Sequence, residues 1–186
     1  MDYWWVNHKQ THSKEINGGY LWSPKRMSNG ARSQYYEFMR QVVPGDRVIS
    51  FANAKISFFG IVIGFPISAP KPDEFQTIGD NWSNDGWYIP IEWHELERPF
   101  RPKDNIDTIK DLLPEQYAPI QQNGNGNQAA YLTKIDFSLF GKLLTLGSTV
   151  DDHQSLPDLV DEENLLKEIE DRIAQNILND KSIDET

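Results

Sequence analysis

Short apolar segments separated by turn residues dominate the first 135 positions of the chain. Aromatic and β-branched residues concentrate in these segments, and such residues favour strands. The pattern predicts strands at residues 3–6, 47–51, 56–65, 87–93 and 131–135. Gly60 and Gly64 fall inside the third of these segments, where glycine indicates a bulge or sharp coiling, as in a small closed barrel.

Apolar residues also recur at steps of three and four between residues 31 and 42, and this spacing predicts a helix with one apolar stripe. Asn29-Gly30 supplies the expected cap region. Two further helices are predicted at residues 104–113 and 136–146, the second capped by Asp136. Strands interspersed with helices in this way place the chain in the α+β class.

Two segments lack such periodicity. Residues 8–17 are polar and predict a loop or a short hairpin arm, in which His8 and His12 are exposed to solvent. Residues 66–85 are rich in Pro, Gly, Asn, Asp and Ser, and predict a long loop that carries Trp82. Loops of this length in a compact domain are often binding elements.

The end of the chain differs from the rest in composition. Residues 149–157 read as a linker, and residues 161–179 predict an acidic helix with an apolar seam. We therefore expect one domain over residues 1–148, followed by an acidic linker and helix over residues 149–186. The helix has three available roles: docking on the domain, pairing with a second copy, or connection to a further domain.

Charge is distributed unevenly along the 186 residues, whose net charge is −10. Residues 1–60 hold 8 Lys+Arg against 4 Asp+Glu, a net of +4, whereas residues 151–186 hold 3 against 12, a net of −9. Because the local charge governs phosphate contact, a nucleic-acid surface in the first third is allowed despite the acidic total.

Cysteine is absent, which excludes disulfides, thiol-ligated zinc and a cysteine nucleophile. The N-terminal segment has no basic region followed by an apolar stretch, so we expect no signal peptide. No apolar run approaches the roughly 20 residues of a membrane helix. The expected compartment is the cytoplasm.

The stretch from Gly18 to Pro24 combines a glycine pair, two aromatic residues and a proline. The glycines permit a turn or a close approach, and Pro24 restricts the residue before it to an extended shape. Trp22 is thereby held next to Lys25, as an aromatic platform for a nucleobase requires. The alternative is that Tyr20 and Trp22 are ordinary core residues at the end of a strand.

Enzymatic motifs are missing: the chain has no phosphate-binding loop, no nucleophile elbow and no paired-histidine metal helix. Glu92 and His94 share one face of a predicted strand, and we interpret them as a polar strand face. His8 and His12 lack a third ligand. We therefore expect no catalytic residue, no metal and no cofactor in this chain.

A module that reads an extruded base fits better, because it needs rings, edge contacts and cations for the flanking phosphates. The predicted base pocket comprises Trp22, Ser23, Tyr20, Asn7, Ser50, Phe51, Asn53, Trp82 and Trp87. The predicted contacts to the nucleic-acid backbone are Lys9, Lys14, Lys25, Arg26, Arg32, Asn125 and Asn127.

Several of these motifs, in this order, carry a resemblance. Residues 3–7, residues 18–25 and Pro44-Gly45-Asp46 resemble the EVE-like branch of the PUA superfamily, and Gly124 to Gln128 followed by Tyr131-Leu132 also matches it. The segment is most similar to the N-terminal sensor domain of modification-dependent HNH restriction endonucleases. In that branch Ser50, Phe51 and Asn53 stand where a Tyr-His-Ser triplet is usual, so this chain departs from the pattern there.

The resemblance implies a PUA/EVE-like twisted β-barrel with peripheral helices, which flips 5-methylcytosine or 5-hydroxymethylcytosine of double-stranded DNA into an aromatic pocket. It also implies an HNH nuclease domain, of which this chain shows no His-Asn-His arrangement. A homodimer through the tail helix or that nuclease domain is a separate expectation. Two alternatives stay open: a PUA-like reader of modified RNA, and a protein-interaction domain.

Overall fold

The structure, a computed structural model, describes residues 1–148. The predicted linker and acidic helix after residue 148 lie outside the described residues, so the proposed division at that point stays a prediction. The strands are β1 (Tyr3–Asn7), β2 (Tyr20–Pro24), β3 (Arg47–Ala52), β4 (Lys55–Val62), β5 (Ile67–Ala69), β6 (Gly86–Phe100) and β7 (Leu132–Ile135). The α-helices are α1 (His12–Gly18), α2 (Gln34–Glu37), α3 (Ile106–Ile109) and α4 (Phe137–Leu146). Single 3₁₀ turns are η1 (Phe38–Gln41), η2 (Asp73–Phe75), η3 (Pro102–Asn105) and η4 (Lys110–Leu112).

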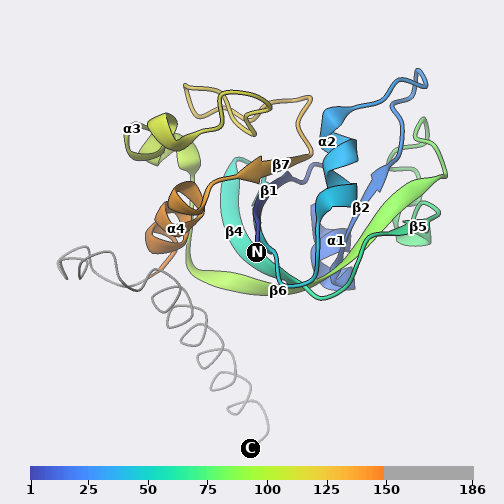
Figure 1. Ribbon diagram of the computed structural model, residues 1–186, viewed down its shortest axis with the longest axis horizontal. Helices are drawn as coiled ribbons and strands as arrows, with labels where there is room; N and C mark the ends of the chain where they lie inside the picture. Colours follow the sequence, from blue (N-terminus) through green and yellow to red (C-terminus); the bar gives the residue numbers. More distant parts are fainter. Residues whose placement is uncertain (149–186) are drawn as a thin grey trace, which may run out of the picture.

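The seven strands form one curled sheet in the order β2-β6-β4-β3-β1-β7, with β5 paired to β6. β1 and β3 run parallel, and every other pair is antiparallel. The sheet curves into a half-barrel whose edge strands are β2 and β7, and Figure 1 shows α2 lying across the opening between them. The expected twisted barrel with peripheral helices is confirmed, as an open half-barrel.

Side-chain alternation divides the sheet into two apolar faces. Trp4, Leu21 and Val48 lie in the inner core of the half-barrel. Trp5 and Ile49, one position along β1 and β3, lie in the outer core, which contains Leu139 and Phe140 of α4. In Figure 1, α4 accordingly packs on the convex side of the sheet, whereas α1 and α2 lie toward the concave side.

The turn Pro44-Gly45-Asp46 ties the start of β1 to the start of β3. The buried Asp46 carboxylate accepts hydrogen bonds from Asp2 N at 2.8 Å, Trp4 Nε1 at 2.9 Å and Val43 N at 3.1 Å. Gly45 has a φ of +95°, a left-handed conformation that favours glycine. The motif therefore has a structural role, which is to join two parallel strands.

The structure corrects four local predictions. Residues 12–18 form α1, which ends at the left-handed Gly19 (φ +70°). The predicted helix over residues 31–42 starts three residues late, at Gln34, because Asn29 Oδ1 accepts a hydrogen bond from Ala31 N and holds a turn there.

The other two corrections concern glycines and a cap. The register shifts of β4 lie near Ile56, so neither Gly60 nor Gly64 makes the expected bulge. A Cβ at Gly60 would meet Trp93 Cε3 at 2.7 Å, so this glycine instead permits close packing between neighbouring strands. Asp136 stands at the N-cap of α4 but makes no side-chain capping bond.

Candidate nucleic-acid interface

The strand register continues the inner apolar face into a group of buried polar side chains. Ser23 follows Leu21 at the two-residue period of β2, and Ser50 follows Val48 in the same way on β3. His8 directly follows β1, and its amide N donates to Phe51 O at 2.9 Å. We call His8, Glu15, Ser23, Ser50 and Tyr131 the inner polar cluster.

Glu15 connects the elements of the inner polar cluster. Its Oε2 accepts hydrogen bonds from Trp22 N at 3.2 Å and from the Tyr131 hydroxyl at 2.8 Å. The same hydroxyl lies 2.8 Å from Trp22 O, so its single proton serves one of these two oxygens. Because Trp22 lies on β2 and Tyr131 directly precedes β7, this network bridges the two edges of the open sheet.

His8 approaches the same carboxylate without a well-formed hydrogen bond. Its Nδ1 lies 3.5 Å from Glu15 Oε2, within ion-pair distance, but the geometry does not satisfy a hydrogen bond. The imidazole packs edge-on against Trp93 at a centroid distance of 5.7 Å and against His12 at 5.4 Å. His8 is therefore held by rings on two sides, and both ring nitrogens stay available for a partner.

Most polar atoms of the inner polar cluster are buried without a protein partner. Among the described residues, such atoms are His8 Nδ1 and Nε2, Glu15 Oε1, Ser23 Oγ, Ser50 Oγ, Trp93 Nε1 and His94 Nε2. Five of these seven atoms belong to the inner polar cluster, and a sixth, on Trp93, belongs to a ring that His8 contacts. A buried polar atom without a partner costs about 1–3 kcal/mol, so a concentration of them marks a place where a polar ligand or ordered water would supply the missing hydrogen bonds.

Burial and charge shift the pKa of two groups here. Burial, and then the Glu15 carboxylate, raise the pKa of Tyr131 well above its ordinary value, so its hydroxyl is a donor over the physiological range. Burial, and then the neighbouring His8, lower the pKa of His12, with Glu15 acting in the opposite sense. His12 is therefore favoured in its neutral form in the folded protein.

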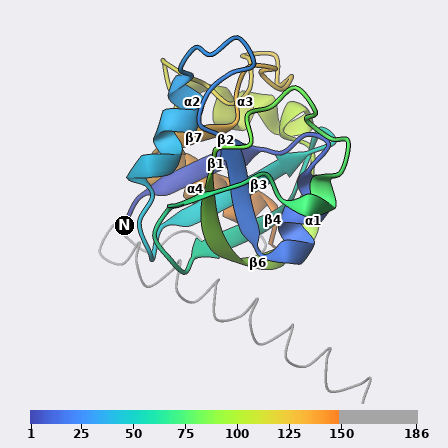
Figure 2. The same ribbon diagram turned by 90° about the vertical axis from the view of Figure 1, so that its right-hand side faces the viewer.

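The segment 113–130 and the loop at residues 25–33 lie at the same end of the half-barrel, in both Figure 1 and Figure 2. Asn7 Nδ2 donates to Pro119 O at 2.8 Å, and Lys9 Nζ donates to Gln128 O. Asn7 is thus buried and connects the end of β1 to this segment, and its predicted role in the base pocket stays a prediction. We call this end of the molecule, with Lys9 and residues 25–33, the basic rim.

Trp87 is the ring that the register places beside Ser23 on the inner face. It is half-buried, with Lys25 Nζ 4.4 Å from its ring centroid and Arg40 at 5.8 Å. Lys25 is held in place by Asp85 at 2.7 Å and by Ser68 Oγ at 2.7 Å. The predicted proximity of a ring and a cation is therefore present at Trp87, where two cations approach one partly exposed indole.

Trp22 and Tyr20 point to the opposite face of β2. Trp22 is 1% exposed, stacks on Trp82 at a centroid distance of 6.2 Å and contacts Phe75 edge-on at 5.8 Å. Tyr20 donates its hydroxyl to Glu74 Oε1 at 2.7 Å, and burial followed by this bond raises its pKa. The structure thus places both rings in a packed cluster, the alternative that the sequence left open, and their role in base binding stays a prediction.

The remaining predicted site residues are scattered. Phe51 is buried in the outer core, and Asn53 is exposed in the β3–β4 turn with a φ of +52°. Arg26 is exposed and donates to Gly30 O at 3.1 Å. The other positions are Lys14, half-buried on α1; Arg32, exposed in the basic rim; Asn125, whose side chain accepts from Lys103 Nζ at 3.3 Å; and Asn127, which donates to Ala118 O at 3.2 Å.

Sequence reasoning missed His8, Glu15 and Tyr131. One signal for a helix was present in the sequence. His12 and Glu15 are three positions apart, which places them on one face of a helix, and Gly18-Gly19 follows as a glycine cap. The loop interpretation of residues 8–17 hid this relationship. Tyr131 carried no local signal, because its partners lie more than 100 positions away.

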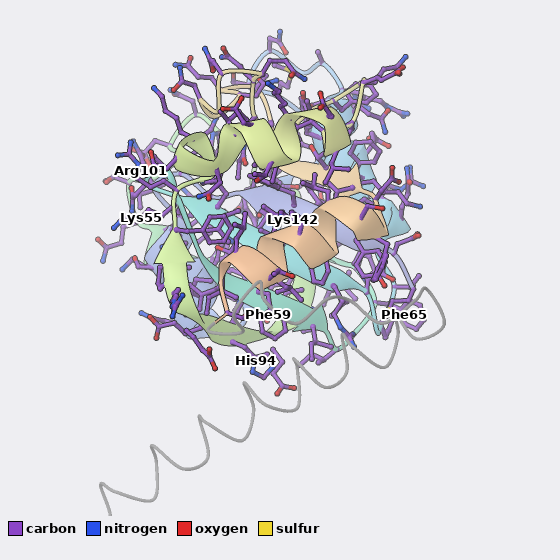
Figure 3. The ribbon with its side chains drawn as sticks, turned by 90° about the vertical axis from the view of Figure 1, so that its left-hand side faces the viewer. Lys55, Phe59, Phe65, His94, Arg101 and Lys142 are labelled. Atoms are coloured by element: carbon purple, nitrogen blue, oxygen red, sulfur yellow. The ribbon has the colours of Figure 1, made fainter. Side chains whose placement is uncertain are left out.

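Among residues 1–148, no group of three His, Asp or Glu side chains has the arrangement to hold a metal ion. His94 Nε2 lies 3.4 Å from Glu92 Oε1, and its ring stacks on that of Phe59 at a centroid distance of 5.0 Å. Figure 3 labels both His94 and Phe59. Across the same span, none of the helices has the length and apolar character to cross a membrane.

Comparison by sequence matches the chain to no protein family and to no curated protein. Comparison by structure does find relatives of the fold. Rpa0253 from Rhodopseudomonas palustris has a TM-score of 0.52 at 12% identity, covering 84% of this chain and 100% of its own. A Pseudomonas putida protein has a TM-score of 0.50 at 10% identity, covering 77% of this chain and 98% of its own.

Human THYN1, whose structure was solved in complex with DNA containing 5-methylcytosine, has a TM-score of 0.51 at 11% identity. The similarity covers 81% of this chain and 100% of that protein. At such low identity these comparisons show the fold alone, which is PUA-like.

Proposed function

We propose that residues 1–148 bind DNA that contains 5-methylcytosine or 5-hydroxymethylcytosine, and that the modified base leaves the duplex to enter the inner polar cluster from the basic rim. One observation carries this proposal. Buried hydroxyl, imidazole and carboxylate atoms without protein partners are concentrated on the inner face of a half-barrel. A nucleobase edge presents donors and acceptors that complete such groups.

The surroundings of the inner polar cluster support a nucleic-acid ligand. Lys9, Arg26 and Arg32 are exposed at the basic rim, and Lys25 and Arg40 flank the half-buried Trp87. A half-buried ring beside cations suits stacking of a base next to its phosphates. The fold shared with human THYN1, which was solved with 5-methylcytosine-containing DNA, adds support for this ligand class.

Equilibrium binding of the full chain to matched duplexes tests the proposal. The duplexes carry one cytosine, 5-methylcytosine or 5-hydroxymethylcytosine at the same position, and single-stranded RNA of the same sequence is the fourth probe. We expect one modified duplex to bind about tenfold or more tightly than the unmodified one, a difference of about 1.4 kcal/mol. Equal affinity for the three duplexes, or tighter binding to RNA, would refute it.

The wider setting is part of the same proposal. A module that recognises modified cytosine suits the specificity step of a modification-dependent restriction endonuclease, with an HNH nuclease domain elsewhere in the system and a dimer as the acting form. Cleavage of modified DNA by this module joined to such a nuclease domain would support that setting. Equal cleavage of modified and unmodified DNA would contradict the restriction-endonuclease setting and leave the binding proposal intact.

A further inference from the structure

The two oxygens of the Glu15 carboxylate have different surroundings. The side chain is 0% exposed, and Oε2 takes both hydrogen bonds that the carboxylate receives, from Trp22 N and the Tyr131 hydroxyl. Oε1 is buried and has no partner. Glu15 thus presents one unused acceptor among the unpartnered groups of the inner polar cluster.

The two hydrogen bonds that Glu15 receives do not by themselves require a carboxylate. One amide oxygen accepts from Trp22 N and from Tyr131 as well as a carboxylate oxygen does, so glutamine would bridge β2 and Tyr131 equally. A buried charge is also costly to keep when one of its oxygens lacks a donor. The carboxylate at position 15 therefore indicates a ligand that brings a donor to Oε1.

We infer that Glu15 determines which base the site accepts, by receiving a hydrogen bond from the 4-amino group of an extruded cytosine. The inference rests on the proposed function and adds its specificity determinant. A carboxylate that accepts from cytosine N4 is a favourable pairing. Thymine presents the O4 carbonyl at that position, and an acceptor facing a buried carboxylate is repelled.

The pair 5-methylcytosine and thymine isolates this contact, because the two bases share the 5-methyl group and differ at position 4 and in the proton on N3. The probes are three duplexes that place 5-methylcytosine, cytosine or thymine opposite the same guanine. A mismatched thymine leaves the stack more easily than a paired base. If ease of extrusion alone decided the affinity, the thymine duplex would bind more tightly. A hydrogen bond from the base to Glu15 predicts the opposite order, with the 5-methylcytosine duplex bound more tightly.

For the wild-type chain we expect the 5-methylcytosine duplex to bind about tenfold or more tightly than the thymine duplex, given about 1–3 kcal/mol for one good base contact. Glu15→Gln keeps an oxygen for Trp22 N and Tyr131 and turns an NH₂ donor toward the base. We expect this variant to lower the ratio of the two affinities at least about tenfold, toward thymine. Asp46→Asn is the matched control: it makes the same carboxylate-to-amide change at a buried carboxylate outside the inner polar cluster, and should leave the ratio unchanged.

The outcomes separate this inference from the proposed function. Preference for 5-methylcytosine over cytosine, together with equal or tighter binding of the thymine duplex by the wild-type chain, overturns the role of Glu15 alone. An unchanged ratio in folded Glu15→Gln overturns it as well. If that variant does not fold, the wild-type comparison still decides. Equal affinity for the cytosine, 5-methylcytosine and 5-hydroxymethylcytosine duplexes overturns the proposed function.

Discussion

Trp22 and Ser23 are adjacent in the chain and point to opposite faces of β2: the indole stacks on Trp82, and the hydroxyl joins the inner polar cluster. The two residues therefore serve different purposes. Trp22 holds the segment 66–85 against the sheet, through Trp82 and through a hydrogen bond from its Nε1 to Ala69 O at 3.3 Å. Ser23 faces the side where we propose that the base binds.

The first prediction concerns the stability that Trp22 provides. Trp22→Ala should lower the free energy of unfolding by about 3–5 kcal/mol, because it removes a fully buried ring and leaves a cavity. Urea unfolding followed by circular dichroism measures it. Trp82→Ala removes a half-buried ring of the same cluster and should lower the free energy of unfolding by a smaller amount.

Gly86→Ala tests the same packing from the other side. An added Cβ would lie 2.3 Å from Trp22 Cε2, so the variant should also be destabilised. If Trp22→Ala unfolds at the wild-type urea concentration and loses only its preference for modified DNA, the ring belongs to the site, as the sequence first suggested.

The sequence predicted the alternation along β2 but not which side of the strand faces inward. Tyr20 and Trp22 share one face, and Leu21 and Ser23 the other, as any strand requires. Which face lies inside the half-barrel depends on the pairing of β2 with β6. It also depends on Phe75, which comes from another segment and packs against the face that carries Trp22. Large rings at a strand end suggested a pocket, whereas here they pack in a third apolar cluster, separate from the inner and outer cores.

The positions of β3 and β7, by contrast, depend on local features that can be read directly, whereas β2 and β5 were not among the predicted strands. The start of β3 follows from Pro44-Gly45-Asp46, and β7 matches its prediction to within one residue. The inner polar cluster could not be predicted in full, because the hydroxyl of Tyr131 meets Glu15 from 116 positions away. Such contacts depend on closure of the sheet, which no local pattern encodes.

A second prediction uses the missing partners of Ser23. Because its buried hydroxyl has no partner in the protein, Ser23→Ala should leave the free energy of unfolding unchanged or raise it. The same variant should weaken binding to the preferred modified duplex about fivefold or more, through loss of about 1 kcal/mol. Thermal unfolding and fluorescence anisotropy measure the two effects.

Thr133→Val provides the matched control for Ser23→Ala. Thr133 is also buried, but its hydroxyl donates to Tyr117 O at 2.9 Å, so the variant should lose about 1 kcal/mol of stability. It should leave DNA binding unchanged. A stability loss for Ser23→Ala as large as that for Thr133→Val would mean that the serine hydroxyl serves the fold.

The third prediction is a dependence of stability on pH that arises at His12. Its pKa is lowered in the folded state, so the unfolded chain binds the proton more readily. As the pH falls below the unfolded pKa of about 6.5, the free energy of unfolding should therefore decrease. His12→Gln should make that decrease smaller between pH 7 and pH 5, measured by urea unfolding at each pH.

His94→Gln is the control for the loss of one histidine, because His94 lies on β6 and stacks on Phe59, away from α1. His8 and Glu15, the two charged neighbours that shift the pKa of His12, are present in both the wild-type chain and His12→Gln. Identical pH profiles for the wild-type chain and His12→Gln would contradict the shift at this residue.

The fourth prediction concerns Asp46. Asp46→Ala leaves the Trp4 indole N–H and two backbone N–H groups without their acceptor, and should lower the free energy of unfolding by about 3 kcal/mol or more. Asp85→Ala is the comparison, because that carboxylate is exposed and pairs with Lys25, and should change it by about 0.5 kcal/mol or less. Equal effects of the two variants would show that the turn does not hold β1 and β3 together.

The last prediction places the phosphates of the bound nucleic acid. If the basic rim contacts them, Lys9→Ala and Arg26→Ala should each weaken binding to modified and unmodified duplexes by the same factor. Each should also reduce the slope of log affinity against log salt concentration by about 1, because one phosphate contact is lost. Anisotropy titrations at several salt concentrations measure both quantities.

Lys134→Ala is the control for these rim variants. Lys134 pairs with Asp2 at 2.8 Å, near the start of β1, whereas the basic rim lies beyond the end of that strand. The variant removes one positive charge from the domain without touching the rim, so it should leave the salt slope at its wild-type value. A slope that falls equally in all three variants would mean that binding responds to net charge alone, and the basic rim would lose its assigned role.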